Sequence, residues 1–251
     1  MIVAPVGFQC PECVGLARRQ TPEVRTVFGA PVISRPTITY GLIGLNVVAF
    51  VASWLLGEDS ITGQFGMYPP LIALDGQWWR LLTSAFLHYG ILHLAFNMYV
   101  LFALGPALER ALGHGRYLVL YVIAALSGTV ASFVLSPVEV NSVGASGAIF
   151  GLMGALVIAG RRLRYDIRQV LVLIGINVAI GFLPGSSIDW RAHLGGLVGG
   201  AVIATIFTRG PQRARLPRQG LLVAGYLVLL VALVVWRVGD LSQVFGALPT
   251  S

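Results

Sequence analysis

The stretch N-S-V-G-A-S-G-A-I-F-G-L-M-G-A-L, residues 141–156, decides the fold of this chain and the kind of chemistry to look for in it. It places Ser146 between small residues at the start of a long apolar run. A helix that begins near Ser146 leaves free backbone N–H groups and the positive end of its dipole at the serine, and both favour a developing oxyanion. Gly147, Gly151 and Ala155 recur every fourth residue, which predicts a flat face for close packing of another membrane helix. The pattern indicates a catalytic serine only if a general base reaches it.

The composition predicts an all-α, polytopic membrane protein. The chain has 251 residues, of which 56% are hydrophobic and only 11% are charged, and its mean hydropathy is +0.81. A soluble domain carries about 25% charged residues, so this class is excluded. All 17 basic residues are arginines, and they lie in short clusters between apolar runs. This distribution is typical of cytoplasmic loops, and nucleic acid is therefore not expected as a partner.

Residues 1–36 are predicted to form a flexible cytosolic arm, because they are polar, interrupted by prolines and without a secretory signal. Cys10 and Cys13 form a C-P-E-C motif in this arm. A zinc site needs four ligands, and the sequence contains no second cysteine pair. Two interpretations stay open, namely a pair of free thiols and half of a zinc site whose other ligands lie in a missing upstream segment. No metal is predicted.

Seven apolar runs are candidate membrane spans, and they cover residues 37–56, 92–112, 117–135, 146–159, 170–183, 192–207 and 221–238. The fourth and fifth are shorter than the roughly 20 residues that a bilayer core requires. Between the first two spans, Trp78, Trp79 and Arg80 favour an element that lies at the membrane interface. We expect three parts: the arm 1–36, a six-helix core 37–208, and a segment 209–251 with an arginine-rich loop, a seventh helix and a short outer tail.

The arginines predict the orientation of these spans in a plasma membrane. With the N-terminus in the cytoplasm, only Arg80, Arg191 and Arg237 of the 17 arginines fall outside. The opposite orientation would invert this distribution and violate the preference for basic residues on the cytoplasmic side. The sequence therefore predicts a cytoplasmic N-terminus and an outer C-terminus.

This topology brings His193 to the outer end of the sixth span, at the depth of Ser146. Gly196 and Gly200 follow four residues apart, and small residues on two helices allow the close packing that a Ser–His hydrogen bond requires. A histidine in a membrane is costly and is a functional candidate by default. The alternative is a histidine that only bonds a neighbouring carbonyl.

His93 and Asn97 lie four residues apart at the outer end of the second span, so they share one helix face. Both side chains can donate hydrogen bonds to an oxyanion. The alternative is that they only hold neighbouring helices together. Three separate elements at one outer level favour the catalytic interpretation.

Together these residues resemble the rhomboid family of intramembrane serine proteases over residues 37–208. The G-x-S-G motif of the family appears at Gly144 to Gly147, and its A-H-x-x-G-x-x-x-G motif runs from Ala192 and His193 to Gly196 and Gly200. Its H-x-x-x-N motif appears as His93 and Asn97, and its W-R pair as Trp79 and Arg80. Phe150 stands where the family often has a tyrosine that packs on the histidine. The seventh helix is similar to the family version with one span after the six-helix core.

The resemblance implies a catalytic dyad of Ser146 and His193, with His93 and Asn97 as oxyanion donors. Gly144, Gly147, Phe150, Gly196 and Gly200 would then pack around the dyad. The implied substrates are transmembrane segments of single-span or other membrane proteins, cut near the outer face of the lipid bilayer. No cofactor and no metal are expected, and the oligomeric state stays open.

Two alternatives from other classes remain. A catalytically inactive rhomboid-like protein that binds membrane clients would typically lack the serine or the histidine, and this chain has both. A small transporter would need paired charges or broken helices in the middle of the membrane, and apart from the histidines no ionisable side chain is expected deep in a span.

Overall fold

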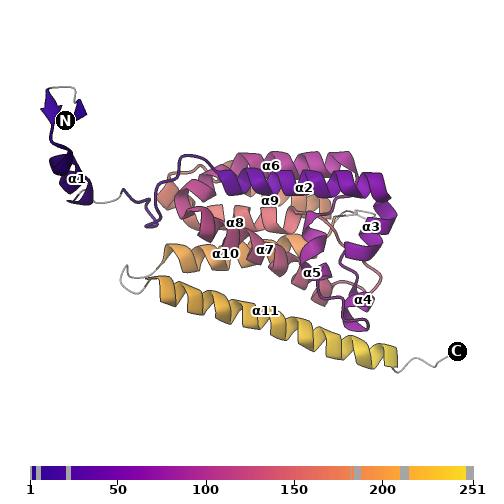
Figure 1. Ribbon diagram of the computed structural model, residues 1–251. Coiled ribbons are helices and arrows are strands. Elements are labelled where there is room, and N and C mark those ends of the chain that lie inside the picture. Colours follow the sequence, from indigo (N-terminus) through magenta and orange to yellow (C-terminus); the bar gives the residue numbers. More distant parts are fainter. Residues whose placement is uncertain are drawn as a thin grey trace.

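The computed structural model is a helical bundle and describes residues 2–3, 7–20, 24–181, 183, 188–209 and 215–246. The main helices run back and forth between two ends of the bundle (Figure 1). Parts of the predicted segment 209–251, namely residues 210–214 and the tail 247–251, lie outside the described residues, as does residue 182 of the fifth predicted span.

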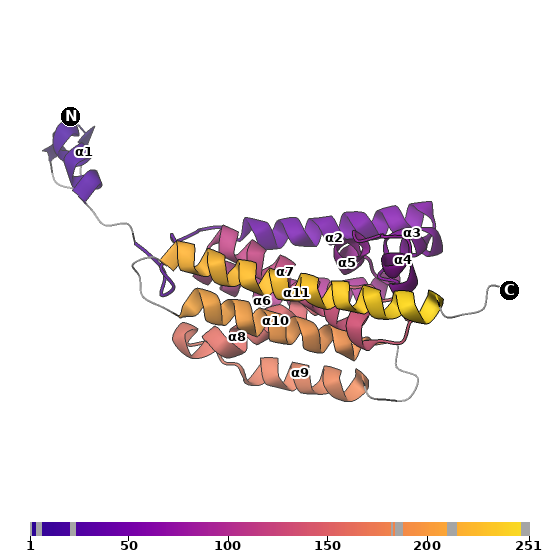
Figure 2. The ribbon, with the colours of Figure 1, turned by 90° about the horizontal axis from the view of Figure 1, so that it is seen from below.

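Among the described residues, six helices are long and apolar enough to cross a membrane. They are α2 (Thr37–Leu56), α6 (Gly90–Leu112), α7 (His114–Leu135), α8 (Ser146–Leu163), α10 (Trp190–Thr208) and α11 (Arg215–Gly246). Each corresponds to a predicted span, and the all-α polytopic fold is confirmed. The fifth predicted span is the shorter helix α9 (Arg168–Gly181), whose 14 residues extend only about 21 Å. It lies beside α8 and α10 (Figure 2).

Four short helices connect α2 to α6 without crossing the bundle. They are α3 (Glu58–Phe65), α4 (Pro69–Ala73), α5 (Arg80–Thr83) and the 3-10 helix η1 (Ser84–Phe86). Arg80 is only 2% exposed, and its guanidinium donates to the carbonyls of Gly63 and Gly66, both at 2.8 Å. Trp79 beside it is half exposed. The segment predicted to lie at the interface therefore consists of short helices, and the buried Arg80 side chain binds two of its carbonyls.

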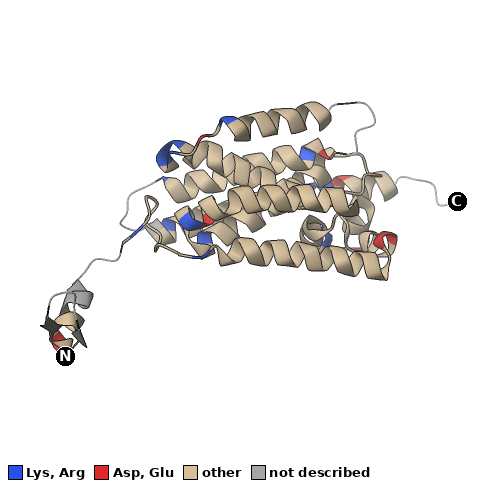
Figure 3. Cartoon of the chain, turned by 90° about the horizontal axis from the view of Figure 1, so that it is seen from above, with Lys and Arg blue, Asp and Glu red and all other residues tan. Residues whose placement is uncertain are grey.

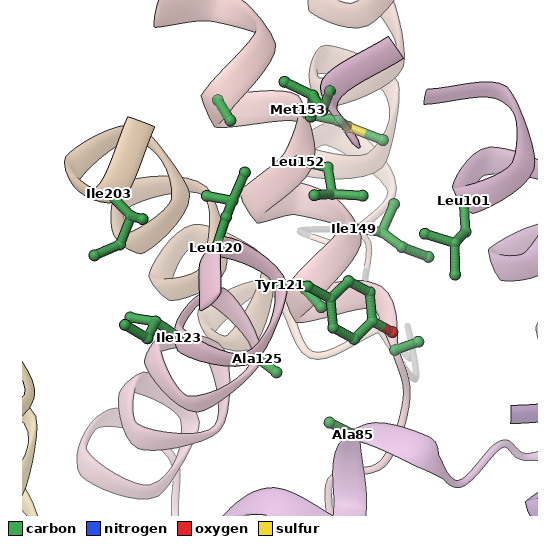
Figure 4. Packing of buried hydrophobic residues seen from close by; sticks show 14 of the residues in the cluster. Ala85, Leu101, Leu120, Tyr121, Ile123, Ala125, Ile149, Leu152, Met153 and Ile203 are labelled. Atoms are coloured by element: carbon green, nitrogen blue, oxygen red, sulfur yellow. The ribbon is translucent and has the colours of Figure 1, made fainter. Parts of the chain in front are cut away.

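Helix α8 forms the centre of the bundle and packs against α6, α7 and α10. Its residues from Gly147 to Leu156 are all buried. Figure 4 shows Leu120 and Tyr121 of α7 in one hydrophobic cluster with Ile149 and Leu152 of α8. Helix α11 covers the outside of α7 and α10 (Figure 1). The residues at the start of α8 are thus held by neighbours on several sides.

Helices α8 and α10 cross with their backbones in contact. A Cβ atom built on Gly196 would lie 1.9 Å from the carbonyl oxygen of Gly147, and one on Gly200 would lie 2.0 Å from that of Gly151. Only glycine permits so close an approach, and small residues are what membrane helices use for it. The crossing holds the first turns of both helices next to each other.

The first turn of α2 is held by a buried carboxylate that sequence analysis did not single out. Glu109 of α6 is fully buried and accepts hydrogen bonds from the backbone N–H groups of Ile38 and Thr39, at 2.9 and 2.8 Å. It also accepts from the Thr39 hydroxyl at 2.6 Å and lies 2.6 Å from Nδ1 of His114. Helix α2 has no side-chain cap of its own, so Glu109 satisfies N–H groups that a helix start leaves open.

The N-terminal part contains two short antiparallel strands, β1 (Ile2–Val3) and β2 (Phe8–Gln9), followed by α1 (Pro11–Gln20). Both thiols of the C-P-E-C motif are exposed. The expectation of a flexible arm is wrong for the segment just before α2. Phe28 is fully buried, and the Thr26 hydroxyl donates to the carbonyl of Ala111 at 2.7 Å. This segment packs on the end of α6.

The charged residues are distributed unevenly along the bundle. Figure 3 shows most of the basic residues at the end nearest the N-terminus. There α6, α8 and α10 end, with Arg110 in the last turn of α6, Arg161 and Arg162 in the last turn of α8, and Arg209 after α10. Helices α6, α8 and α10 all begin at the opposite end. That end holds the residues singled out from the sequence.

Candidate active site

A cavity of about 610 Å³ lies at the end of the bundle where α6, α8 and α10 begin. Ser146, His193, His93 and Asn97 all line it. Further lining comes from the loop before α8, from the loop before α10 and from Asn177 of α9. The four polar residues that the sequence analysis selected from three separate spans therefore share one cavity.

Ser146 is the first residue of α8, and its side chain is half-buried. The first intrahelical hydrogen bond nearby runs from Ile149 N–H to the carbonyl of Ala145, at 3.0 Å. The preceding N–H groups of the first turn therefore have no partner within the helix, which makes this a site for negative charge. The expected helix start at the serine is present.

Gly144 shapes the approach to the serine. Its φ of 137° lies in a region that side-chain-bearing residues rarely adopt. A Cβ atom there would lie 3.0 Å from Cε1 of His93 and 3.5 Å from the Ser146 hydroxyl oxygen. The missing side chain leaves room for both groups at the same point of the cavity.

His193 lies in the first turn of α10 and is only 7% exposed. Its imidazole stacks on the ring of Phe150, with ring centroids 4.2 Å apart and an angle of 11° between the planes. Among the described residues, no hydrogen bond joins the Ser146 hydroxyl to this imidazole. The two side chains face one cavity without being bonded.

Asn97 lies one turn after His93 on α6 and is 3% exposed. Its amide nitrogen donates one hydrogen bond to the backbone carbonyl of His93, at 3.0 Å. An amide carries two N–H groups, so the second is free for another acceptor in the cavity. The bond to the His93 carbonyl fixes the Asn97 amide in place, and its second N–H group can still donate to a ligand in the cavity.

The family model of the rhomboid domain matches residues 75–210, which contain every residue described above for the cavity. The chain belongs to the rhomboid family. The resemblance noted from the motifs is confirmed, and the helical bundle is the polytopic fold of a rhomboid.

Several rhomboid relatives are similar over most of this chain. Rhomboid protease GluP of Bacillus subtilis (strain 168) is 42% identical over 209 residues, which are 80% of this chain and 40% of GluP. YdcA of the same organism is 36% identical over 71% of this chain and 92% of its own length. Rhomboid protease AarA of Providencia stuartii is 29% identical over 71% of this chain and 75% of AarA. The chain thus spans less than half of GluP.

Sequence analysis did not assign a role to His88, which precedes the H-x-x-x-N motif of the rhomboid family by five residues. The side chain is 2% exposed, and its ring meets that of His93 edge to face, with centroids 5.1 Å apart. Burial and the neighbouring His93 lower the pKa of His88 to about 4. His88 is therefore neutral at pH 7 and packs as an uncharged ring. In the sequence, only its position five residues before His93 pointed to a place near the cavity.

Asp189 also lines the rhomboid cavity, but its carboxylate is bonded to serines and to a backbone N–H group. Asp189 lies directly before α10, as its N-cap residue. In the described part of the chain, no group of three or more His, Cys, Asp or Glu side chains is arranged to hold a metal ion. The four residues selected from the sequence bring a hydroxyl, two imidazoles and an amide to the cavity, and the start of α8 adds backbone N–H groups.

Proposed function

We propose that this rhomboid is an intramembrane serine endopeptidase that cleaves transmembrane segments of other membrane proteins through a dyad of Ser146 and His193. One observation carries the proposal: a hydroxyl at the first residue of α8 and a ring-stacked imidazole on α10 line the same cavity. A nucleophile, a base and a helix start for the oxyanion are the parts that acyl transfer requires.

The reaction follows from these parts. His193 takes the proton of the Ser146 hydroxyl while the oxygen attacks a peptide carbonyl, and the resulting oxyanion accepts hydrogen bonds from the Ser146 N–H group, His93 and Asn97. The imidazolium returns its proton to the leaving amine, which leaves an acyl-enzyme on Ser146. A water molecule, deprotonated by His193, then releases the acid and the free serine. The Ser146 hydroxyl and the His193 imidazole need to form their hydrogen bond only in the complex with substrate, as is common for catalytic hydrogen bonds.

The substrate segment must unwind at the cut, because an intact helix hides its carbonyls in hydrogen bonds. We infer that the cavity faces the outer side of a plasma membrane, that the N-terminus is cytoplasmic and that the C-terminus is outside. The cluster of arginines at the opposite end of the bundle supports this orientation. An alkaline phosphatase fused after α11 should be active in cells, because the proposed C-terminus lies outside. An inactive fusion would indicate the opposite orientation.

The test of the activity uses purified protein in detergent and a single-span substrate with small residues near the expected cut. Ser146→Ala, His193→Ala and the double variant should each lose nearly all cleavage, because residues that act as a unit have non-additive effects. Ser242→Ala, an exposed serine on α11, is the matched control and should cleave at the wild-type rate. Wild-type cleavage by Ser146→Ala would disprove the proposal. No cleavage by wild type, together with substrate binding, would favour the inactive client-binding alternative.

A further inference from the structure

We propose that Asp189 is a positioning residue, whose carboxylate sets the distance between Ser146 and His193 by joining the three segments that carry or support them. The inference rests on the proposed function, because it assumes that this pair performs the reaction. Asp189 is not the acid of a Ser–His–Asp triad, since in the described residues its carboxylate makes no hydrogen bond to the His193 ring.

Three hydrogen bonds surround this carboxylate. Oδ2 accepts from the hydroxyl of Ser132, near the end of α7, and from the hydroxyl of Ser142, in the loop before α8, at 2.6 Å. Oδ1 accepts from the backbone N–H of Ala192 at 3.2 Å, which caps the start of α10. Bonds to an ionised carboxylate are shorter and about twice as strong as those between neutral groups. One side chain therefore ties together three elements.

The bonded atoms lie close to the reacting residues along the chain. Ser142 precedes Ser146 by four residues, and its backbone also pairs with Met67 through two hydrogen bonds of 3.0 and 3.1 Å. His193 follows Asp189 by four residues, and its N–H donates to the Asp189 carbonyl at 3.2 Å. The carboxylate thus links the segment that leads into the nucleophile to the turn that carries the base.

The bond from Asp189 to α7 matters because α7 contacts both α8 and α10, so it can limit how far these two helices slide past each other. Its Gly128 lies against both helices, since a Cβ atom there would be 2.9 Å from the carbonyl oxygen of Ala192 and 3.1 Å from Cα of Gly147. One turn further along α7, Ser132 holds Asp189. Glycine contact sets how closely α8 and α10 approach α7, whereas the carboxylate sets how far the ends of these segments slide along it. A shift of about 1 Å at reacting atoms can cost about 100-fold in rate.

The experiment measures kcat and KM for Asp189→Ala and Asp189→Asn in the full chain, with thermal unfolding recorded on the same samples. We expect Asp189→Ala to lower kcat about 100-fold and to leave KM within about twofold, because the substrate cavity remains but the dyad is misplaced. Asp189→Asn keeps an oxygen that accepts the hydrogen bond from the Ala192 N–H group. It also gains two N–H groups that can donate hydrogen bonds to the serine hydroxyl oxygens. It should therefore recover most of the lost kcat.

A mutant cycle tests whether the serines act through the same carboxylate. In a Ser132→Ala/Ser142→Ala background, Asp189→Ala should cause little further loss of kcat, because the two side-chain partners of the carboxylate are already missing and only the bond to Ala192 is left. Asp240→Asn, which changes an exposed aspartate paired with Arg237 on α11, is the matched control and should leave kcat unchanged. If Asp189→Ala does not fold, the Ser132→Ala/Ser142→Ala variant should show the same loss of kcat with KM unchanged, because it removes the two side-chain partners of the carboxylate. A wild-type kcat in that folded variant would then overturn the positioning role.

The outcomes separate the two proposals. A wild-type kcat in the folded fraction of Asp189→Ala, with Ser146→Ala inactive, overturns the positioning role and leaves the protease intact. A loss that appears only as a lower unfolding temperature or only in KM also overturns the positioning role. Cleavage by Ser146→Ala at the wild-type rate overturns both.

Discussion

The rings of Phe150 and His193 stack nearly parallel, with centroids 4.2 Å apart and planes 11° apart, although the residues lie on different helices. Phe150 is one turn into α8 and His193 is in the first turn of α10. The stack is possible because the glycines of these helices bring their backbones into contact. The ring of Phe150 thus fixes the plane in which the His193 imidazole can meet a serine on the same helix as Phe150.

Loss of the stack should reduce activity more than stability. Aromatic pairs contribute about 0.5–1.5 kcal/mol beyond their buried area, so Phe150→Leu should lower kcat up to about tenfold. Phe150→Tyr keeps the stacking surface and should stay within about twofold of wild type. The measurement is steady-state cleavage of a model transmembrane substrate. Equal kcat for Phe150→Leu and wild type would mean that the stack does not orient the imidazole.

The glycine crossing should tolerate no added atom. Gly196→Ala and Gly200→Ala place a methyl group within 2.0 Å of a backbone oxygen, so the helices must separate at a cost of about 1–3 kcal/mol or more. We expect a sharp loss of cleavage and a lower unfolding temperature in protein that still inserts. Gly175→Ala and Gly225→Ala are the controls, because a Cβ atom there meets nothing within 4 Å. Full activity of Gly200→Ala would contradict the close crossing.

The two proposed oxyanion donors, His93 and Asn97, should affect kcat without unfolding the protein. Asn97→Ala and His93→Ala should each lower kcat about 100- to 1000-fold, the usual effect of losing one oxyanion donor. Asn46→Ala is a matched control, since Asn46 of α2 makes the same kind of hydrogen bond to the carbonyl four residues earlier, at 2.7 Å, and does not line the cavity. If Asn97→Ala loses only as much kcat as Asn46→Ala, Asn97 is a packing residue.

The buried Glu109 should be a stability residue and not a catalytic one. Glu109→Ala leaves the donors of Ile38, Thr39 and His114 without their acceptor, which should cost about 3 kcal/mol of unfolding free energy. The folded fraction should keep the wild-type kcat, because Glu109 does not line the cavity. Thermal unfolding in detergent, with the exposed Glu139→Gln as control, measures the effect. An unchanged unfolding temperature would show that water replaces the carboxylate.

Much of this protein follows from the order of residues along the chain. Apolar runs predicted each membrane-length helix, because span length and hydropathy depend only on consecutive residues. The motifs at Ser146, His193 and His93 could be assigned to one level of the bundle, because antiparallel spans alternate their ends. The helix start at Ser146 was also visible locally, in the small residues before the apolar run.

Contacts between distant segments could not be read in the same way. The bond of Thr39 to Glu109 joins residues 70 positions apart, and the bonds of Asp189 reach residues 47 and 57 positions away. The residues around Glu109 and Asp189 do not show which distant groups bind these carboxylates. The prolines before α2 likewise do not show whether that segment is packed or flexible. The order of residues was enough to predict the class of protein, the spans and the candidate residues for catalysis. Tertiary structure alone decided which of them meet, because side-chain direction and helix contact depend on how the whole bundle packs.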